Sequence, residues 1–438
     1  MKKNLRKLAL SILLDYEASD KYINLALSSH SLDSLDDKER ALLTSLVYTT
    51  VERKLTYDYY ISAIAKRSDA SIDPYTKNIL RLGLCQIIDI NSVPDFAAVN
   101  ESVNLARNSG ERSFVNGVLR AAVRQKDDMP MPPPEKNYRR YLSVKYSFPL
   151  SIVKHFDGLY GSEDTERILE FYNREKYTDI TINTTKISVG DYKEMLKEKG
   201  YQLEKNSLTE RSLRIVGSVN PERLPGFSQG LFFVQDRASA IAGAVLDPNS
   251  GDLIIDVCSA PGGKSFAAAI NASGKGEVHS FDLHESKLSL IRSGAERLSL
   301  DMIKVDCRDA LDPDSTLFGK ADRVICDAPC SGLGVLGKKP DLRYKDLDSV
   351  ESLADLQYSI LSASSKYLKE GGIMVYSTCT LNPLENENVV ERFISENTDF
   401  EMVPFAIGEI NADSGMITLL PHIHHTDGFF MAKIRRKI

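Results

Sequence analysis

The chain has 438 residues, of which 42% are hydrophobic and 26% charged, and its formal net charge is −6. At roughly 100–200 residues per domain this length predicts two to four domains, and the composition excludes a wholly disordered or collagen-like chain. No uninterrupted apolar run approaches the roughly 18 residues of a membrane-spanning helix, so the sequence excludes a transmembrane protein. Residues 221–438 carry 22 Lys and Arg against 31 Asp and Glu. A nucleic-acid surface would therefore have to be a local basic patch.

The first 125 residues have the pattern of a helical bundle. A basic start followed by an apolar stretch resembles a signal peptide, but no small-residue cleavage site follows, so we predict the first amphipathic helix of a cytoplasmic protein. Asp73-Pro74 is a helix-start signal. The proline-rich residues 129–134 cannot continue a helix and predict an extended linker. Apolar residues recur at helical spacing along residues 5–12, 43–55, 80–88 and 115–122.

The rest of the chain predicts two further domains. Residues 137–240 mix two helical patterns with one strand pattern, at 179–183, which predicts a small α+β unit. From residue 250 onward, strands alternate with helices, which is typical of a parallel sheet covered on both faces. These strands are predicted at 253–257, 277–282, 302–305, 323–326 and 373–376. We predict a helical domain over 1–128, a linker and small α+β domain over 129–240, and an α/β domain over 241–438.

Ligands of such sheets bind at the carboxyl ends of the strands, and a glycine-rich turn lies at the first of these ends. It reads Cys258-Ser259-Ala260-Pro261-Gly262-Gly263-Lys264 and opens a helix, whose first N–H groups and dipole can face a ligand. Asp282 ends the next strand, 19 residues after Gly263, where an acid can bind ribose hydroxyls. An ordinary tight turn with an incidental acid explains these residues equally well when they are taken alone.

Further chemistry-bearing residues follow the later strands. Asp309 and Asp327 add two carboxylates at strand ends, and together with Asp282 they suit a nucleoside-bearing cofactor. Cys330 and Cys379 follow neighbouring strands, so both thiols can reach one cleft, where a cysteine can act as a nucleophile. Buried structural thiols are the alternative. Zinc is disfavoured because Cys326 and Cys330 have no histidine pair nearby, and we expect no metal. Six cysteines in 438 residues fit a reducing compartment rather than a disulfide scaffold.

Three motifs follow one another in the last domain. They are Ala260-Pro261-Gly262-Gly263-Lys264, Asp327-Ala328-Pro329-Cys330-Ser331-Gly332 and Ser377-Thr378-Cys379. Together they resemble the motifs of the RNA cytosine-C5 methyltransferases, which use S-adenosylmethionine. The similarity spans about residues 220–435 and includes Val234-Gln235-Asp236 and Asp427-Gly428-Phe429-Phe430. The N-terminal bundle resembles the NusB-type RNA-binding domain, with Phe114-Val115-Asn116-Gly117-Val118-Leu119-Arg120 close to its final helix.

The resemblance implies a fold and a set of roles. The α/β domain would be a Rossmann-like methyltransferase domain, and the pairing with a NusB-like bundle implies small-subunit (16S) ribosomal RNA as the substrate. Cys379 would attack C6 of cytosine, Asp327 would hydrogen-bond at N3, and Cys330 would help to release the product. The cofactor would contact Cys258, Ser259, Ala260, Pro261, Gly262, Gly263, Lys264, Asp282, Asp309 and Asp327. Chemistry alone does not assign the two thiols, because DNA cytosine methyltransferases use the cysteine of a Pro-Cys motif.

The sequence departs from the family at three places that concern target recognition. It contains no tryptophan, it has Thr181-Ile182-Asn183 where Arg-Val-Asn is usual, and Leu333 replaces a small residue. A stacked cytosine hides C5 and C6, so the target must be single-stranded or flipped out. Phosphate contacts are expected among the basic residues Arg53, Lys54, Arg120, Arg124, Arg139, Arg140, Lys338, Lys339, Arg343 and Lys345.

The sequence thus predicts a monomeric enzyme that acts on ribosomal RNA, without DNA, membrane or metal. Two alternatives stay open: the same reaction on transfer RNA or another structured RNA, and a non-catalytic RNA-binding assembly factor with a relic cofactor pocket. The presence of Cys330, Cys379 and Asp327 together argues against the second alternative.

Overall fold

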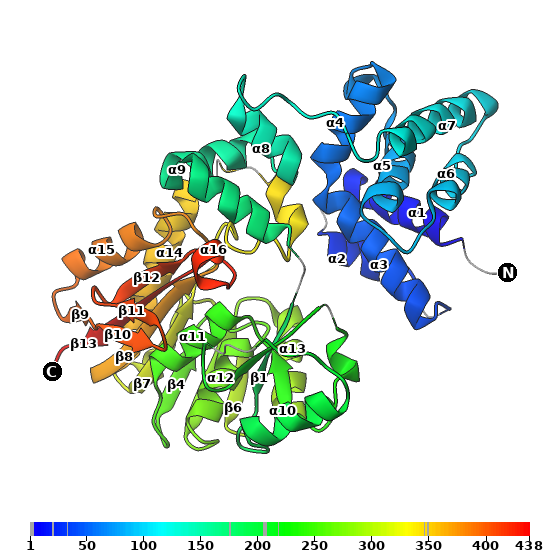
Figure 1. Ribbon diagram of the computed structural model, residues 1–438. Coiled ribbons are helices and arrows are strands. Elements are labelled where there is room, and N and C mark those ends of the chain that lie inside the picture. Colours follow the sequence, from blue (N-terminus) through cyan, green and yellow to red (C-terminus); the bar gives the residue numbers. More distant parts are fainter. Residues whose placement is uncertain are drawn as a thin grey trace. The chain divides into compact units, whose positions relative to one another are not determined.

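The computed structural model describes residues 4–19, 22–32, 34–174, 177–204, 208–217, 219–345, 347 and 350–438. Residues 1–3 of the predicted N-terminal helical segment lie outside the described residues. The chain divides into two compact units (Figure 1). The helical unit comprises Met1–Asn173 and Lys339–Lys345, and the sheet unit comprises Arg174–Lys338 and Asp346–Ile438. Among the described residues, none of the helices combines the length and the apolarity needed to span a bilayer.

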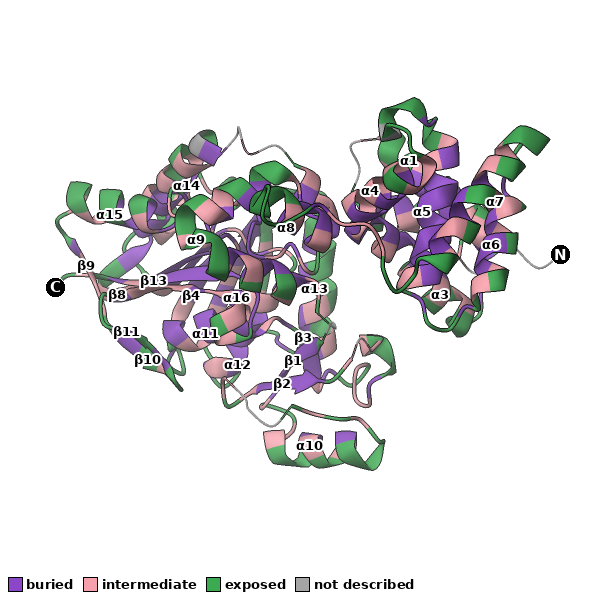
Figure 2. Cartoon of the chain, turned by 45° about the horizontal axis from the view of Figure 1, so that its top comes forward, coloured by how far each residue is buried: buried purple, intermediate pink, exposed green. Residues whose placement is uncertain are grey.

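The helical unit is a bundle around one central helix. Its helices are α1 (Leu5–Ala18), α2 (Ile23–Ser28), α3 (Asp37–Glu52), α4 (Lys54–Ala65), α5 (Pro74–Ile88), α6 (Asp95–Val103), α7 (Ser109–Arg124), α8 (Tyr138–Tyr146) and α9 (Leu150–Tyr172), with 3-10 turns at Asp69–Ser71 and Pro340–Tyr344. Helix α5 is buried along nearly its whole length and packs against α1, α3, α4, α6 and α7 (Figure 2). Asp73 caps it by accepting from Thr76 N, as the helix-start signal predicts.

One apolar stripe spans two helices instead of one. The stripe at 43–55 crosses Arg53, which lies between the end of α3 and the start of α4. Arg53 has φ −100° and ψ 12°, outside the helical region, so the chain turns there: Leu43, Val47 and Val51 lie in the core, whereas Leu55 beyond the turn is only partly buried. Periodicity predicted the buried face of α3 correctly but not the break.

The sheet unit contains the predicted α/β domain and the small α+β part. Its strands are β1 (Thr178–Ile182), β2 (Ser212–Ile215), β3 (Phe232–Val234), β4 (Leu253–Asp256), β5 (Glu277–Asp282), β6 (Ile303–Cys307), β7 (Ala321–Asp327), β8 (Leu368–Thr378), β9 (Phe400–Met402), β10 (Phe405–Ile407), β11 (Ile410–Ala412), β12 (Met416–Leu419) and β13 (Phe429–Arg436). Its helices are α10 (Val189–Glu198), α11 (Arg237–Leu246), α12 (Gly263–Asn271), α13 (Glu285–Leu298), α14 (Val350–Ser365), α15 (Glu387–Glu396) and α16 (Pro421–His424), with 3-10 turns at Pro221–Arg223 and Ser315–Leu317.

The large sheet has the order β12-β13-β8-β7-β4-β5-β6, with β9 also paired to β13. Strands β8, β7, β4, β5 and β6 are parallel, β13 is antiparallel to β8, and β12 is antiparallel to β13. All five strands predicted at 253–376 are present, but the sheet is mixed rather than wholly parallel. The antiparallel end forms because β13 returns alongside β8 over residues 430–435.

Both faces of this sheet are covered by helices, as predicted. Along β4, Ile254 packs into the core beneath α11, α12 and α13, whereas Ile255 packs into the opposite core beneath α14 and α15. The same alternation places Ile325 on the first face and Cys326 on the second, where Cys326 is fully buried. Cys326 is therefore a core side chain.

The small sheet has the order β2-β1-β3, is antiparallel and carries α10. Its core is formed by residues such as Ile180, Tyr192 and Phe232. A buried ion pair crosses its β1 and β2 strands: Arg214 donates to both carboxylate oxygens of Asp179, at 2.6 and 2.8 Å. The expected fold class is confirmed in all three parts. The boundaries after residues 128 and 240 stay predictions, and α8 and α9 group with the bundle in the helical unit.

Candidate active site

The site lies where three adjacent strands of the large sheet end in a carboxylate. In sheet order these are β7, β4 and β5, which end at Asp327, Asp256 and Asp282. Asp327 pairs in register with Ser377 of β8, so the segments that follow β7 and β8 leave the sheet side by side. The predicted convergence of strand-end residues is confirmed for Asp282 and Asp327. Asp309 lies two residues beyond β6, is exposed and accepts from Leu311 N at 2.9 Å.

The glycine-rich turn after β4 is held by the end of β5. Ser259 N and Oγ each donate to Phe281 O at 2.8 Å, and Ala260 N donates to Asp282 Oδ2 at 3.1 Å. Gly262 has φ 110°, and a Cβ there would overlap the ring of Phe266, so only glycine fits. The turn therefore begins helix α12 at Gly263, with the first N–H groups of the helix facing the strand ends.

Asp282 supports the turn rather than standing free as a ribose-binding acid. Its two oxygens accept from Ala260 N and, at 3.0 Å, from His284 N. A carboxylate offers about four lone-pair sites, so Asp282 can accept further hydrogen bonds from a ligand while it holds the turn.

Lys264 and Asp327 form an ion pair at the centre of the site. Lys264 Nζ donates to Asp327 Oδ2 at 2.7 Å and to Ser239 Oγ at 2.9 Å, and it lies 5.2 Å from the ring centre of Phe429. Ser377 Oγ donates to the other oxygen of Asp327 at 2.7 Å. Burial lowers the pKa of Lys264, but the Asp327 carboxylate outweighs this and the net shift is upward. Lys264 is therefore a fixed cation beside Asp327.

The two thiols predicted to share a cleft are in contact. Cys330 Sγ and Cys379 Sγ lie 3.1 Å apart, and both residues are partly exposed. The pKa of the Cys330 thiol is raised well above its usual range by the hydrogen bond to Cys379, by burial and by the Glu385 carboxylate. The predicted proximity is confirmed, and the chemical role of each thiol stays a prediction.

Close backbone packing fixes the position of Cys379. Gly334 N donates to Cys379 O at 2.9 Å, and Gly428 N donates to Gly334 O at 2.8 Å. A Cβ at Gly334 would overlap the carbonyl oxygen of Gly428. Three segments that are distant in the sequence thus meet at the backbone of Cys379. Their backbones can approach this closely because two of the segments have glycine at the contact.

Two acids of this region were missed by sequence reasoning. Asp256 is fully buried and accepts from Ser265 Oγ at 2.7 Å, and burial raises its pKa to about 7. An acid that closes an otherwise apolar strand immediately before a glycine-rich turn is a signal that could have found it. Glu385 is also fully buried and lies six residues after Cys379. The polar run of Thr380, Asn382 and Asn386 around it was the available signal.

Cys258 lies at the base of the turn and is partly buried. Burial raises the pKa of its thiol well above the usual range, with nearby acids adding to the effect. A protonated thiol there contributes packing and a weak donor, not a nucleophile. No group of three or more His, Cys, Asp and Glu is placed to hold a metal ion within the described part of the chain.

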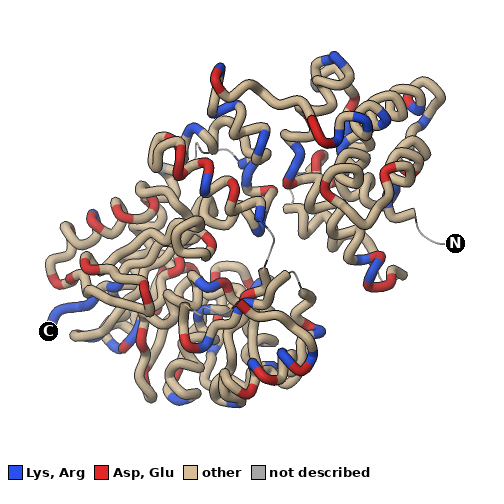
Figure 3. Tube along the Cα trace, viewed as in Figure 1, with Lys and Arg blue, Asp and Glu red and all other residues tan. Residues whose placement is uncertain are grey.

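The basic residues expected to contact phosphate divide into two groups. Arg120, Arg124 and Arg140 are exposed in the helical unit, as is Lys339. The prediction for Arg343 is wrong: its side chain is fully buried and donates to Glu52 O at 3.1 Å. Figure 3 shows Lys and Arg interspersed with Asp and Glu along both units, as the overall charge implies.

Other predicted phosphate contacts are engaged in ion pairs or hydrogen bonds. Lys338 Nζ pairs with Asp236 at 2.5 Å and with Asp427 at 2.9 Å, although its side chain stays partly exposed. Arg139 pairs with Asp157, and Arg53 donates to Lys145 O at 3.0 Å. A phosphate would have to compete with these partners, so the exposed arginines of the preceding group are the better candidates.

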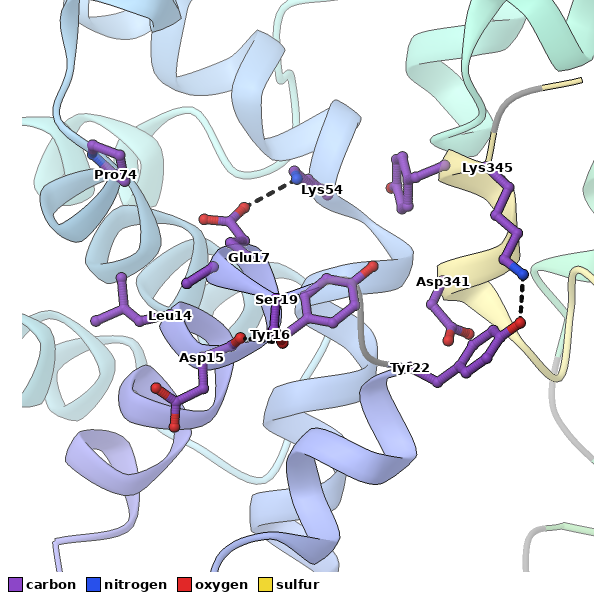
Figure 4. Close-up of a pocket in the computed structure, with 12 residues that line it drawn as sticks. Leu14, Asp15, Tyr16, Glu17, Ser19, Tyr22, Lys54, Pro74, Asp341 and Lys345 are labelled. Atoms are coloured by element: carbon purple, nitrogen blue, oxygen red, sulfur yellow. Dashed lines mark hydrogen bonds and ion pairs between the residues drawn. The ribbon is translucent and has the colours of Figure 1, made fainter. Parts of the chain in front are cut away.

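A pocket of about 750 Å³ opens in the helical unit, lined by α1, the start of α4 and the turn at Pro340–Tyr344 (Figure 4). Its charged side chains are Asp15, Glu17, Lys54, Asp341 and Lys345. Lys54 pairs with Glu17 at 3.0 Å, and Lys345 donates to the hydroxyl of Tyr22. Because both lysines are engaged and carboxylates outnumber them, this pocket is not a phosphate site.

Three family models match the chain. They are the 16S rRNA methyltransferase RsmB/F model over residues 243–435, the NusB family over 3–124 and the Methyltr_RsmF/B-like ferredoxin-like domain over 148–221. Among solved structures, that of PH0851 is 25% identical with a TM-score of 0.77, covering 99% of this chain and 98% of that one. A methyltransferase homologue from Pyrococcus horikoshii is 28% identical with a TM-score of 0.60, covering 68% of this chain and 99% of that one.

Curated relatives match over the full length. The "Probable ribosomal RNA small subunit methyltransferase B" of Bacillus subtilis is 35% identical, covering 100% of this chain and 99% of the relative. A protein of the same name from Synechocystis sp. is 35% identical, covering 98% and 99%. The ribosomal RNA small subunit methyltransferase B of Serratia proteamaculans is 29% identical, covering 92% and 91%. The chain therefore belongs to the ribosomal RNA small subunit methyltransferase B family.

Proposed function

We propose that this protein methylates C5 of a cytosine in small-subunit (16S) ribosomal RNA, using S-adenosylmethionine and a covalent bond between Cys379 and C6 of the base. The observation that carries the proposal is the 3.1 Å contact between the Cys330 and Cys379 sulfurs beside the Lys264–Asp327 ion pair. Membership of the family supports methylation of ribosomal RNA, and the thiol pair supports the choice of cytosine C5.

The turn at residues 258–264 and the strand-end acids fit the proposed cofactor. The turn brings the N-terminus of α12 to the strand ends, and Asp282 retains lone pairs for ribose hydroxyls while it holds Ala260. The exposed carboxylate of Asp309 lies beyond the neighbouring strand β6. When bound, the cofactor supplies an electrophilic methyl group on a positively charged sulfur.

The two cysteines and Asp327 account for activation of the base. A sulfur–C6 bond from Cys379 moves electrons from the C5–C6 double bond into the ring, so C5 becomes nucleophilic and charge develops at N3. As negative charge develops at N3, the adjacent Lys264 ammonium stabilises it and N3 takes up a proton from solvent, so that N3–H donates a hydrogen bond to the Asp327 carboxylate. Once C5 carries the methyl group, N3 and C5 give up their protons to solvent water, the electrons of the C5–H bond re-form the C5–C6 double bond, and the S–C6 bond breaks. The Cys330 thiol assists by donating a hydrogen bond to the departing Cys379 sulfur.

The RNA must present an unstacked cytosine to this site. The exposed Arg120 and Arg124 of α7 and Arg140 of α8 are the proposed phosphate contacts of the helical unit. Contacts of this type depend on ionic strength, so binding should weaken as salt is raised.

The deciding experiment is in vitro methylation of purified ribosomal and transfer RNA with labelled S-adenosylmethionine, followed by bisulfite mapping of the product. We expect 5-methylcytosine at one site of small-subunit ribosomal RNA. Label in transfer RNA alone would overturn the proposed substrate. A protein that binds RNA but neither binds S-adenosylmethionine nor transfers label would instead be an assembly factor.

A further inference from the structure

A buried carboxylate lies behind the two thiols. Glu385 is fully buried, and its Oε1 accepts from Ser331 N at 2.8 Å and from Gln357 Nε2 at 3.0 Å. Its Oε2 accepts from Ser331 Oγ at 2.6 Å, from Thr380 Oγ1 at 3.2 Å and from Asn382 Nδ2 at 3.3 Å. This one side chain thus gathers five donors from three segments of the chain.

Two of the residues that donate to Glu385 are direct neighbours of the thiols. Ser331 follows Cys330, and Thr380 follows Cys379. Ser331 Oγ and Thr380 Oγ1 also lie 2.8 Å apart, so the segments bearing the two thiols meet side by side at Glu385. Gln357 extends the connection to the Cys330 segment, since its Nε2 also donates to Pro329 O at 2.9 Å.

The backbone that presents Glu385 is fixed independently. Tyr376 OH donates to Glu385 O at 2.7 Å, and the next residue, Asn386, accepts from Thr378 Oγ1 at 2.5 Å and donates to Thr380 O at 3.0 Å. A buried carboxylate is costly unless its lone pairs are satisfied. The complete set of donors therefore favours one arrangement of both cysteine segments over looser ones.

We propose that Glu385 is a positioning residue of the site and that it holds the Cys330 and Cys379 sulfurs at contact distance. The catalytic consequence of this positioning rests on the proposed function. The positioning itself is a property of this chain alone. We assign Glu385 no contact with substrate or cofactor, because it acts through Ser331 and Thr380.

The charge of Glu385 has a second effect on the pair. As a like charge near the Cys330 sulfur, it adds to the contact with Cys379 and to burial in raising the pKa of Cys330. Lys264, by contrast, attracts a thiolate at Cys379. Glu385 therefore favours a proton on Cys330, which matches the role of Cys330 as a hydrogen-bond donor to the departing Cys379 sulfur.

The test is Glu385→Gln, which keeps the size of the side chain but removes the charge and one pair of acceptor sites. The matched control is Glu391→Gln, an exposed glutamate of α15. We expect Glu385→Gln to lower kcat for methyl transfer by about tenfold or more, because small displacements of reacting groups are costly. The KM for S-adenosylmethionine should stay unchanged, since the hydrogen-bond partners of the Glu385 carboxylate are Ser331, Gln357, Thr380 and Asn382 and not residues of the turn at 258–264. The control should match the wild type in both constants.

A readout without RNA or cofactor separates this inference from the proposed function. Alkylation of each cysteine by iodoacetamide is followed by mass spectrometry as a function of pH. In Glu385→Gln the Cys330 profile should move to lower pH, with a rate at pH 8 about threefold or more above the wild type. An unchanged profile together with an unchanged kcat would overturn the proposal. A wild-type protein that methylates no cytosine would overturn the proposed function only, and the alkylation profile would still decide on Glu385.

A second variant covers the case in which Glu385→Gln does not fold. Ser331→Ala removes the Oγ bond to Glu385 Oε2 but keeps the backbone bond to Oε1. We expect the same changes as in Glu385→Gln at smaller size. A folded Ser331→Ala protein with wild-type kcat and a wild-type Cys330 profile would contradict the proposal.

Discussion

Lys264 Nζ donates to Asp327 Oδ2 at 2.7 Å, joining the first turn of α12 to the end of β7. The ion pair couples the turn assigned to the cofactor with the acid assigned to the base. Its lysine is largely buried and its aspartate only partly so. Its removal should therefore affect catalysis more than folding.

Lys264→Met is expected to lower methyl transfer by about a hundredfold, because it removes the fixed cation beside the charge that develops on the base. The free energy of unfolding should fall by about 1–3 kcal/mol, since Asp327 loses its partner while staying partly hydrated. Methylation kinetics and urea denaturation measure the two effects. Lys287→Met, on the exposed side of α13, is the control. Full activity in Lys264→Met would contradict the role given to the pair.

The two cysteines should give opposite phenotypes. Cys379→Ala is expected to abolish turnover and any covalent RNA adduct, whereas Cys330→Ala should let the adduct accumulate because departure of Cys379 is impaired. Denaturing gels of protein mixed with labelled RNA and S-adenosylmethionine measure the adduct. Cys307→Ala, an exposed thiol away from the pair, should behave as the wild type. Reversed phenotypes would show that the two thiol roles have been exchanged.

Gly334→Ala is expected to destabilise the protein by about 3 kcal/mol, because its Cβ would overlap Gly428 O and force the backbones apart. The shift should also displace Cys379, whose carbonyl accepts from Gly334 N, so activity should fall with stability. The control is Gly117→Ala in α7, where a Cβ meets no atom within 4 Å. It should stabilise the helix by about 0.5–1 kcal/mol. Equal melting temperatures for the two variants would refute the argument.

Asp256 makes stability depend on pH in a defined direction. Burial raises its pKa from 3.8 to about 7, so between these values the folded state binds a proton that the unfolded state lacks. The contribution of Asp256 to the free energy of unfolding therefore falls by at most about 4 kcal/mol as pH rises from about 4 to 7, and it is constant above pH 7. Denaturation at pH 5 and pH 8 measures this fall.

The control for the pH experiment is Asp256→Asn. Burial and the neighbouring Asp236 also raise the pKa of Asp427 to about 7. Asp427 therefore contributes in the same pH window, and it remains in the variant. The difference between wild type and variant therefore isolates Asp256. We expect the pH dependence to be shallower in Asp256→Asn, and a steeper one would contradict the assignment.

The sequence was sufficient to predict the structure wherever a local pattern of residues determines it. The alternation of strand and helix patterns located the strands from β4 to β8, and the acids Asp282 and Asp327 that end two of them lie at one edge, as predicted. The sequence was insufficient where contacts between distant segments of the chain determine the structure. The donors to Glu385 include Ser331 and Gln357, 54 and 28 residues away, and Arg343 donates to Glu52, 291 residues away. A cluster of basic residues does not reveal which of them is buried by a partner far along the chain.

The excursion of residues 339–345 into the helical unit has a practical consequence. These residues interrupt the sheet unit between its two thiols, and within the helical unit Arg343 donates to Asn173 Oδ1 at 2.9 Å and stacks 3.9 Å from the ring centre of Phe148. No single cleavage of the chain separates the halves intact. A fragment that starts at residue 174 would expose residues 339–345 to solvent. The complementary fragment, which ends at residue 173, would lose the buried side chains that these residues contribute to the helical unit. Dissection of the protein therefore requires excising this turn or co-expressing both fragments.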